Sequence, residues 1–177
     1  MGTTIATSRL VTLEEAGPDD EDEFLAAVIS SRGLHHPWVD PPDGPERYAL
    51  LLERNRRPEH FTFLVRERDG GVLAGTVNVT NIVRGAFQSA FCGYCAYAGS
   101  QGRGLMTDGL RSVVDHAFAE LGLHRLEANI QPANVASIAL AERCGFGFEG
   151  FSPRYLMVDG DWRDHNRYAI TSDRPAP

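Results

Sequence analysis

The sequence has no apolar run that approaches the roughly 20 residues a membrane-spanning helix needs. Its first eight residues lack the basic patch and apolar stretch of a secretory signal, so we expect a cytoplasmic protein. It also lacks internal repeats and long linkers. A length of 177 residues, near the usual size of one domain, then predicts a single domain over 1–172. Only the proline-rich end, 173–177, is predicted to be disordered.

Basic residues are the minority, with 17 Lys and Arg against 24 Asp and Glu and a net charge of −7. This balance disfavours nonspecific nucleic-acid binding and mildly favours cationic partners. The three cysteines form no even set for disulfides, and no second CxxC follows Cys92 and Cys95 to complete a zinc site. Aromatic neighbours favour a strand for these two cysteines. The histidines are scattered without a helical HxxxH motif, so no metal centre is predicted.

Hydrophobic periodicity and turn residues predict strands and helices in a mixed order. The expected strands are 7–13, 60–66, 72–82, 88–97, 124–130, 148–158 and 164–171. The expected helices are 19–31, 46–55, 106–121 and 134–144, the first opening on an acidic run that we interpret as a solvated helix start. Residues 33–44 read as a stiff, proline-rich loop. The order predicts an α+β or α/β fold with about seven strands, mostly antiparallel, and about four helices.

The segment from Gln101 to Met106 joins a strand to the most strongly periodic helix. Gly102 and Gly104 allow the backbone to bend closely around a ligand. Free N–H groups at a helix start, together with the helix dipole, attract phosphate oxygens. The segment is neither the dinucleotide fingerprint, whose third glycine fails, nor a P-loop, because no GK[ST] follows. From these residues alone, a pyrophosphate site and a plain tight turn are equally supported.

A second motif opens the helix expected at 134–144. Asn134 is suited to cap this helix, and Ser137 lies three positions later on its first turn. Taken alone, the pair indicates simple capping. Gly145 is then expected at the left-handed position that ends the helix.

Together, the runs QGRGLMTDGL, NVASIALAERCGFGFEG and SPRYLMVDGDWRDHNRYAI resemble the GNAT superfamily of N-acetyltransferases. The resemblance is close to its RimJ/RimL branch of ribosomal-protein N-terminal acetyltransferases. It extends from Arg9-Leu10, through His36-Pro37-Trp38, to Ala169. The loop matches the superfamily pattern [QR]xxGx[GA] except that Met106 replaces the last small residue, a change that this branch commonly carries.

The resemblance implies a GNAT fold in which acetyl-CoA lies between a fourth strand (88–97) and a fifth (124–130) that splay apart. The pantetheine arm would pair with the fourth strand and with Asn134, and the pyrophosphate would bind N–H groups of residues 103–107. A main-chain N–H on the fourth strand would stabilise charge on the acetyl carbonyl. The expected coenzyme-binding residues are Cys95, Ala96, Tyr97, Gln101, Gly102, Arg103, Gly104, Leu105, Met106, Thr107, Asn134 and Ser137.

Acetyl transfer needs a base or a water path that takes a proton from the amine, and an acid that helps the thiolate leave. In RimL-like members a serine at the position of Ser137 is that acid, so Ser137 is the first candidate. The glutamate that these enzymes carry before a Tyr-Leu pair is Arg154 here. We take Glu127 as the substitute base, with a structural strand carboxylate as the alternative. His35 and His36 are third choices, since histidine transfers protons near neutral pH. Acceptor contacts are expected from His35, His36, Trp38 and Tyr155.

The leading functional expectation is acetyl transfer to a protein N-terminal α-amine, because the RimJ motif DGxWRDH recurs at 159–165. One alternative is a small amine such as an antibiotic, polyamine or amino-acid derivative, which an acidic, enclosed pocket would favour over an open cleft. Another is a non-catalytic acyl-CoA-binding module, because Arg154 stands where RimL-like enzymes carry the glutamate. Many relatives form homodimers, but no stripe in the sequence marks such a surface.

Overall fold

The computed structural model describes residues 3–173, and one eight-stranded sheet forms its centre. The strand order is β1-β2-β3-β4-β5-β6-β8-β7, with β5 and β6 parallel and every other neighbouring pair antiparallel. The strands are β1 Thr4–Thr7, β2 Val11–Glu15, β3 Phe61–Glu67, β4 Leu73–Val83, β5 Ser89–Ala96, β6 Arg125–Ile130, β7 Gly147–Val158 and β8 Asp161–Thr171. The mixed fold predicted from the sequence is confirmed.

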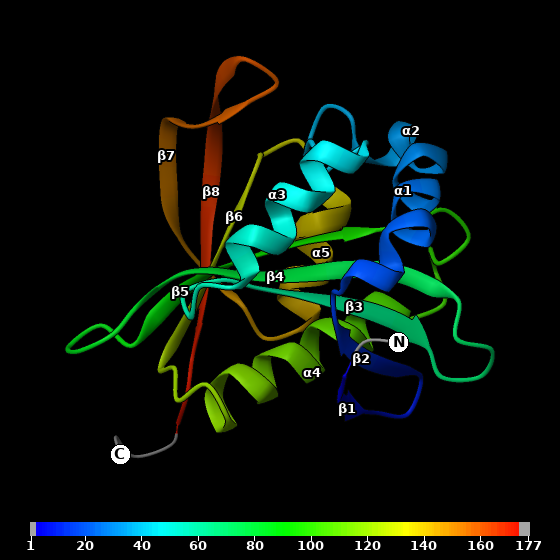
Figure 1. Ribbon diagram of the computed structural model, residues 1–177. Helices are drawn as coiled ribbons and strands as arrows, with labels where there is room; N and C mark the ends of the chain where they lie inside the picture. The colour runs from blue at the N-terminus through cyan, green and yellow to red at the C-terminus, as the bar shows by residue number, and fades with distance from the viewer. Residues whose placement is uncertain (1–2, 174–177) are drawn as a thin grey trace.

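Helices cover both faces of this sheet (Figure 1). They are α1 Glu21–Ser30, α2 Arg32–His35, α3 Pro45–Asn55, α4 Leu105–Ala119 and α5 Val135–Arg143, with a short 3-10 helix η1 at Pro18–Asp20. The larger core lies under α4 and α5, and a second core lies under α1 and α3. A Cβ on Gly109 would lie 2.6 Å from Val65 Cγ1, so this glycine lets α4 approach β3 closely. Within the described range, none of these helices has both the length and the apolar character to cross a membrane.

The first predicted strand, 7–13, is wrong as a single element, which is one reason why the sheet has eight strands rather than about seven. The chain turns after Thr7, and β1 pairs antiparallel with β2. Asp108 at the start of α4 fixes this turn, because its Oδ2 accepts hydrogen bonds from Ser8 Oγ at 2.6 Å and Leu10 N at 2.7 Å. A partner 100 residues away sets the break, so local periodicity does not reveal it.

The predicted loop at 33–44 contains a helical turn, α2, so that five α-helices are present rather than about four. The N–H of His36 donates to Arg32 O at 3.0 Å, and the N–H of His35 to Ser31 O at 3.2 Å. The prolines that favoured a loop begin only at Pro37 and therefore leave these residues free to close the turn. The predicted tail is described only at Asp173, which is outside any element; 174–177 lie outside the described residues.

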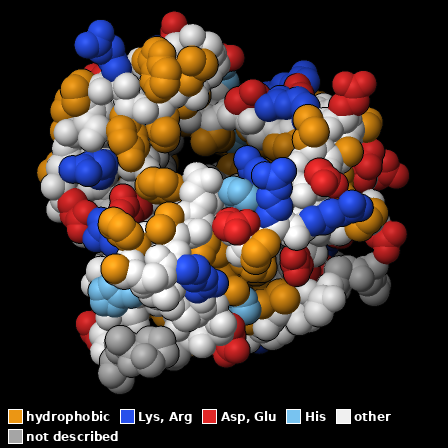
Figure 2. Space-filling view, turned by 60° about the vertical axis from the view of Figure 1, so that its left-hand side comes forward, with side chains coloured by type: hydrophobic (Ala, Val, Ile, Leu, Met, Phe, Trp, Pro, Cys, Tyr) orange, Lys and Arg blue, Asp and Glu red, His pale blue; other side chains and the backbone are white. Residues whose placement is uncertain are grey.

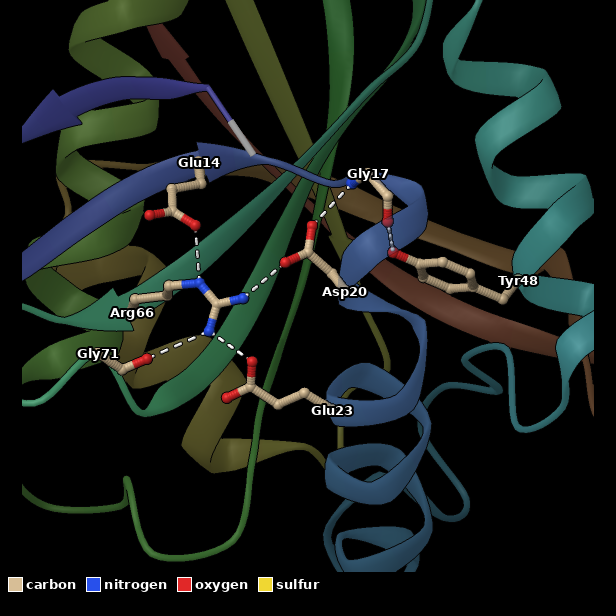
Figure 3. Close-up of polar contacts among 7 residues, drawn as sticks. All are labelled: Glu14, Gly17, Asp20, Glu23, Tyr48, Arg66 and Gly71. Atoms are coloured by element: carbon tan, nitrogen blue, oxygen red, sulfur yellow. Dashed lines mark hydrogen bonds and ion pairs between the residues drawn. The ribbon is translucent and has the colours of Figure 1, made fainter. Parts of the chain in front are cut away.

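The acidic run before α1 is not simply solvated, because it surrounds a buried arginine (Figure 3). Arg66 of β3 is bonded to Glu14 at 2.8 Å, Asp20 at 2.8 Å and Glu23 at 2.6 Å, and its side chain is 13% exposed. One guanidinium thus joins β2, η1 and α1 to the centre of the sheet. Such planar, multidentate pairing is a property of arginine rather than of lysine.

The same network reaches α3 through the backbone of Gly17 (Figure 3). Asp20 Oδ2 accepts a hydrogen bond from Gly17 N at 2.9 Å, and Tyr48 Oη donates to Gly17 O at 2.7 Å. Tyr48 is fully buried in the second core. The layer formed by α1 and α3 is therefore held at a fixed place over β3 and β4.

Candidate active site

A gap opens in the sheet where β5 and β6 part. These parallel strands are paired only from Ser89 with Arg125 to Phe91 with Glu127. Beyond that point β5 continues to Ala96 and β6 to Ile130 without a common ladder. A cavity of about 420 Å³ fills the gap. Of the expected site residues, those that line it are His35, Trp38, Cys95, Ala96, Gln101, Asn134 and Ser137.

The loop expected to bind pyrophosphate adopts the conformation that its glycines permit. Gly102 and Gly104 have φ of 71° and 77°, in the left-handed region that favours glycine. The first hydrogen bond into α4 runs from Asp108 N to Gly104 O at 3.0 Å, so the N–H groups of Leu105, Met106 and Thr107 precede the helical ladder. A Cβ on Gly102 would meet no atom within 4 Å, which leaves open space above the loop.

The side chains of this loop contribute to packing rather than to the open surface. Leu105 and Met106 are buried in the larger core. Met106 Sδ lies where a Cβ on Gly75 of β4 would be, at 2.4 Å, so the long methionine fits over a glycine. Arg103 is ion-paired with Glu67 at the end of β3. These contacts leave the main-chain N–H groups of residues 105–107 as the donors that the loop offers to a ligand.

The start of α5 joins the capping pair to a tyrosine that sequence reasoning missed. Asn134 Oδ1 accepts a hydrogen bond from Ser137 N at 3.1 Å, as its capping role predicts. Ser137 Oγ donates to Tyr94 Oη at 3.1 Å, and Tyr94 Oη donates to Ser137 O at 3.0 Å. Burial raises the pKa of Tyr94, so its phenol stays protonated. In the sequence, Tyr94 is an ordinary aromatic residue of a predicted strand, and nothing there indicates its hydrogen bonds with Ser137.

His35 and Tyr97 hold the end of β5 on the side of α2. The imidazole of His35 is buried, and its Nε2 donates to Ala96 O at 3.0 Å. Its ring lies against Tyr97, with centroids 5.8 Å apart. Tyr97 is buried away from the cavity, and its N–H donates to Ala74 O at 2.8 Å. His35 therefore already occupies one main-chain group at which the sequence analysis expected the pantetheine arm.

The remaining candidates lie outside the cavity. Glu127 is paired with Arg125 at 2.9 Å, and Arg125 is also bonded to Glu149. His36 is exposed, and its Nε2 lies 3.6 Å from Asp159 Oδ2. Tyr155 packs on the ring of His165, with centroids 6.1 Å apart. None of these three side chains lines the cavity, and only Tyr155 touches a residue that does, His165; their roles stay predictions.

The sequence and the fold match one family. Residues 10–147 match the model of the acetyltransferase (GNAT) domain. The chain belongs to the GNAT acetyltransferases. It is 41% identical over 125 residues to the probable N-acetyltransferase YjcK of Bacillus subtilis, covering 71% of this chain and 69% of that protein. It is 33% identical over 163 residues to the [ribosomal protein uS5]-alanine N-acetyltransferase of Escherichia coli, covering 86% of this chain and 84% of that protein.

Solved structures agree with this assignment. RimJ of Mycobacterium smegmatis in complex with CoA-disulfide superimposes with a TM-score of 0.86 and 29% identity, covering 97% of this chain and 88% of that one. This GNAT protein is an acetyl-CoA-dependent N-acetyltransferase. Its cavity fits the coenzyme: about 420 Å³ is within the usual range for ligand pockets, and the loop at its end offers unpaired N–H groups.

Two GNAT site residues were missed by sequence reasoning, Tyr94 and His165. Both line the cavity. His165 is part of the run that carried the family resemblance, but nothing in its spacing distinguished it from a strand residue. The pairing of β8 with β6 places His165 on the face of the sheet that also carries Asn129, and this pairing is a property of the fold.

Proposed function

We propose that this GNAT acetyltransferase acetylates the N-terminal α-amine of a protein, of the ribosomal-protein alanine type. The observation that carries the proposal is a second cavity, of about 470 Å³, on the face of the sheet covered by α1 and α3. It shares Val39 and, on β5, Gly93, Tyr94 and Cys95 with the coenzyme cavity. An acceptor in the second cavity therefore meets the coenzyme at the same three residues of β5.

The floor of this second cavity is a polar row across three strands. Thr62 of β3 pairs with Asn78 of β4, and Asn78 pairs with Gly93 of β5. The buried Oδ1 of Asn78 has no hydrogen-bond partner within the described residues 3–173. An unpaired buried acceptor is costly, and the N–H of a peptide backbone would satisfy it. The row spans two strand spacings, roughly 10 Å, which is the length of about three extended residues.

The charge of this cavity favours a peptide end over a polyamine. Asp40 is the one carboxylate that lines it, and Asp40 is bonded to Arg47 at 2.8 Å. Arg54 also lines it and has no ion-pair partner among residues 3–173. A polycation would find no free carboxylate there. The face in Figure 2 is hollowed in its upper part, with Arg side chains on the right of the hollow and hydrophobic side chains on its left.

The relatives support the same acceptor class. The Escherichia coli protein acts on an alanine of ribosomal protein uS5, and the Mycobacterium smegmatis structure is a RimJ protein. Both resemble this chain over most of its length. We transfer the acceptor class, an N-terminal amine, and leave the individual ribosomal protein to experiment.

In this mechanism Asn134 and the N–H groups of 103–107 hold the coenzyme, whose acetyl thioester is attacked by the amine nitrogen. Because main-chain groups of a strand alternate in direction, Tyr94 N–H points to the gap, on the same side as Ala96 O, and can donate to the acetyl oxygen. Ser137 and Tyr94 place a hydroxyl pair in the cavity wall that can give a proton to the released sulfur. Residues 37 and 38 close over the gap, since Gln131 Nε2 donates to both of their carbonyl oxygens at 3.2 Å.

The test is thiol release from acetyl-CoA with matched acceptors. We would compare a peptide with a free N-terminal alanine, the same peptide with a blocked N-terminus, spermidine and an aminoglycoside. Turnover of the free peptide only, with the added acetyl group on the α-nitrogen by mass spectrometry, supports the proposal. Turnover of spermidine or the aminoglycoside with neither peptide contradicts it. Acetyl-CoA binding without any turnover would favour the non-catalytic alternative.

A further inference from the structure

A buried histidine stands in the wall of the coenzyme cavity, at the level where β6 has left β5. His165 of β8 lines this cavity and is 3% exposed. The next residue, Asn166, pairs with Ile130 at the end of β6, beyond the paired part of β5 and β6. The imidazole therefore borders the gap itself and not the closed part of the sheet.

Strand alternation puts His165 on the acceptor side of the sheet. Ala128 of β6 and its partner Tyr168 of β8 both belong to the core under α4 and α5. Successive side chains of a strand alternate between faces, so His165, three residues before Tyr168, points to the opposite face. That face is the one covered by α1 and α3, where the second cavity lies. His165 thus lines the coenzyme cavity on the face of the sheet from which the acceptor approaches.

The hydrogen bond of the ring fixes its tautomer. Nδ1 lies 2.9 Å from Arg163 O, and a carbonyl oxygen only accepts, so Nδ1 carries the proton. Nε2 of the neutral ring then has a free lone pair. Among residues 3–173, Nε2 has no hydrogen-bond partner. The ring is held further by Tyr155 of β7, with centroids 6.1 Å apart.

The surroundings keep this imidazole neutral. Burial lowers the pKa of His165, and this effect exceeds the opposite effects of the Arg163 carbonyl and of Asp164. The other titratable groups that touch the ring or line the same cavity are Tyr155 from β7 and, from α2 and β5, His35, Cys92, Tyr94 and Cys95.

We propose that His165 is the general base of the acetyl transfer, with Nε2 taking a proton from the acceptor nitrogen. The inference rests on the proposed function only in requiring an amine acceptor. The reaction forms one C–N bond, breaks one C–S bond and releases one proton when the amine arrives as an ammonium ion. His165 takes that proton and returns it to solvent. As the amide forms, the nitrogen loses a second proton. Ser137 and Tyr94 can give a proton to the released thiolate, and the second proton from the nitrogen replaces it, so that one proton in all is released.

Glu127, the base predicted from the sequence, is less well placed for this step. Its carboxylate is engaged by Arg125, which is also bound to Glu149, and it does not line the coenzyme cavity. His165, in contrast, lines the cavity and has a free Nε2 lone pair.

The test is the pH dependence of kcat/KM for the acceptor in the full chain, with His165→Gln and His165→Ala. A general base is worth roughly 100-fold or more, so both variants should lose about that factor. Wild type should show an acidic limb, where protonated His165 is inactive, and His165→Gln should lack it. Added imidazole should restore turnover in His165→Ala, and substituted imidazoles should restore it in the order of their basicity. Damage to the fold alone would give no such order.

The matched control is His116→Gln. His116 of α4 is half-buried, and its pKa is likewise lowered chiefly by burial, but it packs on Phe63 away from both cavities. This variant should keep the acidic limb. If His165→Gln retains both rate and limb while Glu127→Gln loses them, the inference is wrong and acetyl transfer stands. If wild type binds acetyl-CoA in a calorimeter but acetylates no amine, both the inference and the proposed function are overturned.

Discussion

The phenol oxygen of Tyr94 accepts a hydrogen bond from the Ser137 hydroxyl at 3.1 Å and donates to the Ser137 carbonyl at 3.0 Å. The two side chains come from β5 and α5, and both line the coenzyme cavity. Each is therefore positioned by the other, and the pair closes the gap between strand and helix. The sequence indicates Ser137 alone, but in the structure Ser137 and Tyr94 form one hydrogen-bonded pair.

If the pair protonates the released sulfur, its members should act as one unit. We expect Ser137→Ala and Tyr94→Phe each to lower kcat about tenfold or more, with a smaller effect on acetyl-CoA affinity. The double variant should lose little more than either single variant, because both remove the same proton path. Steady-state kinetics and calorimetry on the four proteins measure this. Fully additive losses would show that the two hydroxyl groups act separately.

Gly104 should be essential for coenzyme binding because a tryptophan there would crowd the loop beside Leu10, whose Cδ1 lies 3.6 Å from the position of a Cβ. We expect Gly104→Trp to abolish the heat of acetyl-CoA binding. The matched control is Gly85→Trp in the turn between β4 and β5. Gly85 has φ of 70° against 77° for Gly104, so both substitutions strain the backbone alike. Binding lost in both variants would point to general damage, and binding kept in Gly104→Trp would remove the loop from the site.

The sequence indicated the helix-start segments of the candidate site but not the residues that meet them, for a physical reason. Gln101 to Thr107 and Asn134 to Ser137 are each continuous segments at a helix start, and local patterns read such segments well. Their partners come from distant strands. Tyr94 meets Ser137 over 43 residues, and no spacing rule connects them. Long-range contacts of this kind need the folded sheet.

The same distinction explains the errors in the fold. Elements with a strong period, such as α4, were predicted within two residues of their observed ends. The turn between β1 and β2 depends on Asp108, and the ion-pair cluster around Arg66 depends on acids from three separate elements. The acidic run at 19–23 predicts the start of a helix, but it does not predict that Arg66 lies among these acids.

Arg66 should contribute strongly to stability through its three acidic partners. Removing one partner of a buried ion pair leaves uncompensated charge, and Asp20 is only 6% exposed, so we expect Arg66→Met to cost roughly 3 kcal/mol. Urea unfolding measures this free energy. The control is Arg68→Met, whose partner Asp69 is 85% exposed and whose loss should cost less than about 1 kcal/mol. Equal costs for the two variants would mean that the Arg66 cluster adds no more than a surface pair.

Two histidines whose pKa burial lowers should make the fold less stable in mild acid. Burial lowers the pKa of His116 and of His165 below the ordinary value of 6.5. The unfolded chain therefore binds more protons than the folded chain below about pH 6.5, and the free energy of unfolding must fall as pH falls through the folded-state values. Above about pH 6.5 both rings are neutral in either state, and this contribution is fully present.

Urea unfolding at pH 7.5 and pH 5.5 tests this linkage. We expect the wild type to lose stability between the two values, and His116→Gln to lose less, because glutamine binds no proton in either state. His124→Gln, at an exposed position, is the matched control and should keep the wild-type difference. A His116→Gln protein with the full wild-type loss would show that other groups carry the acid sensitivity.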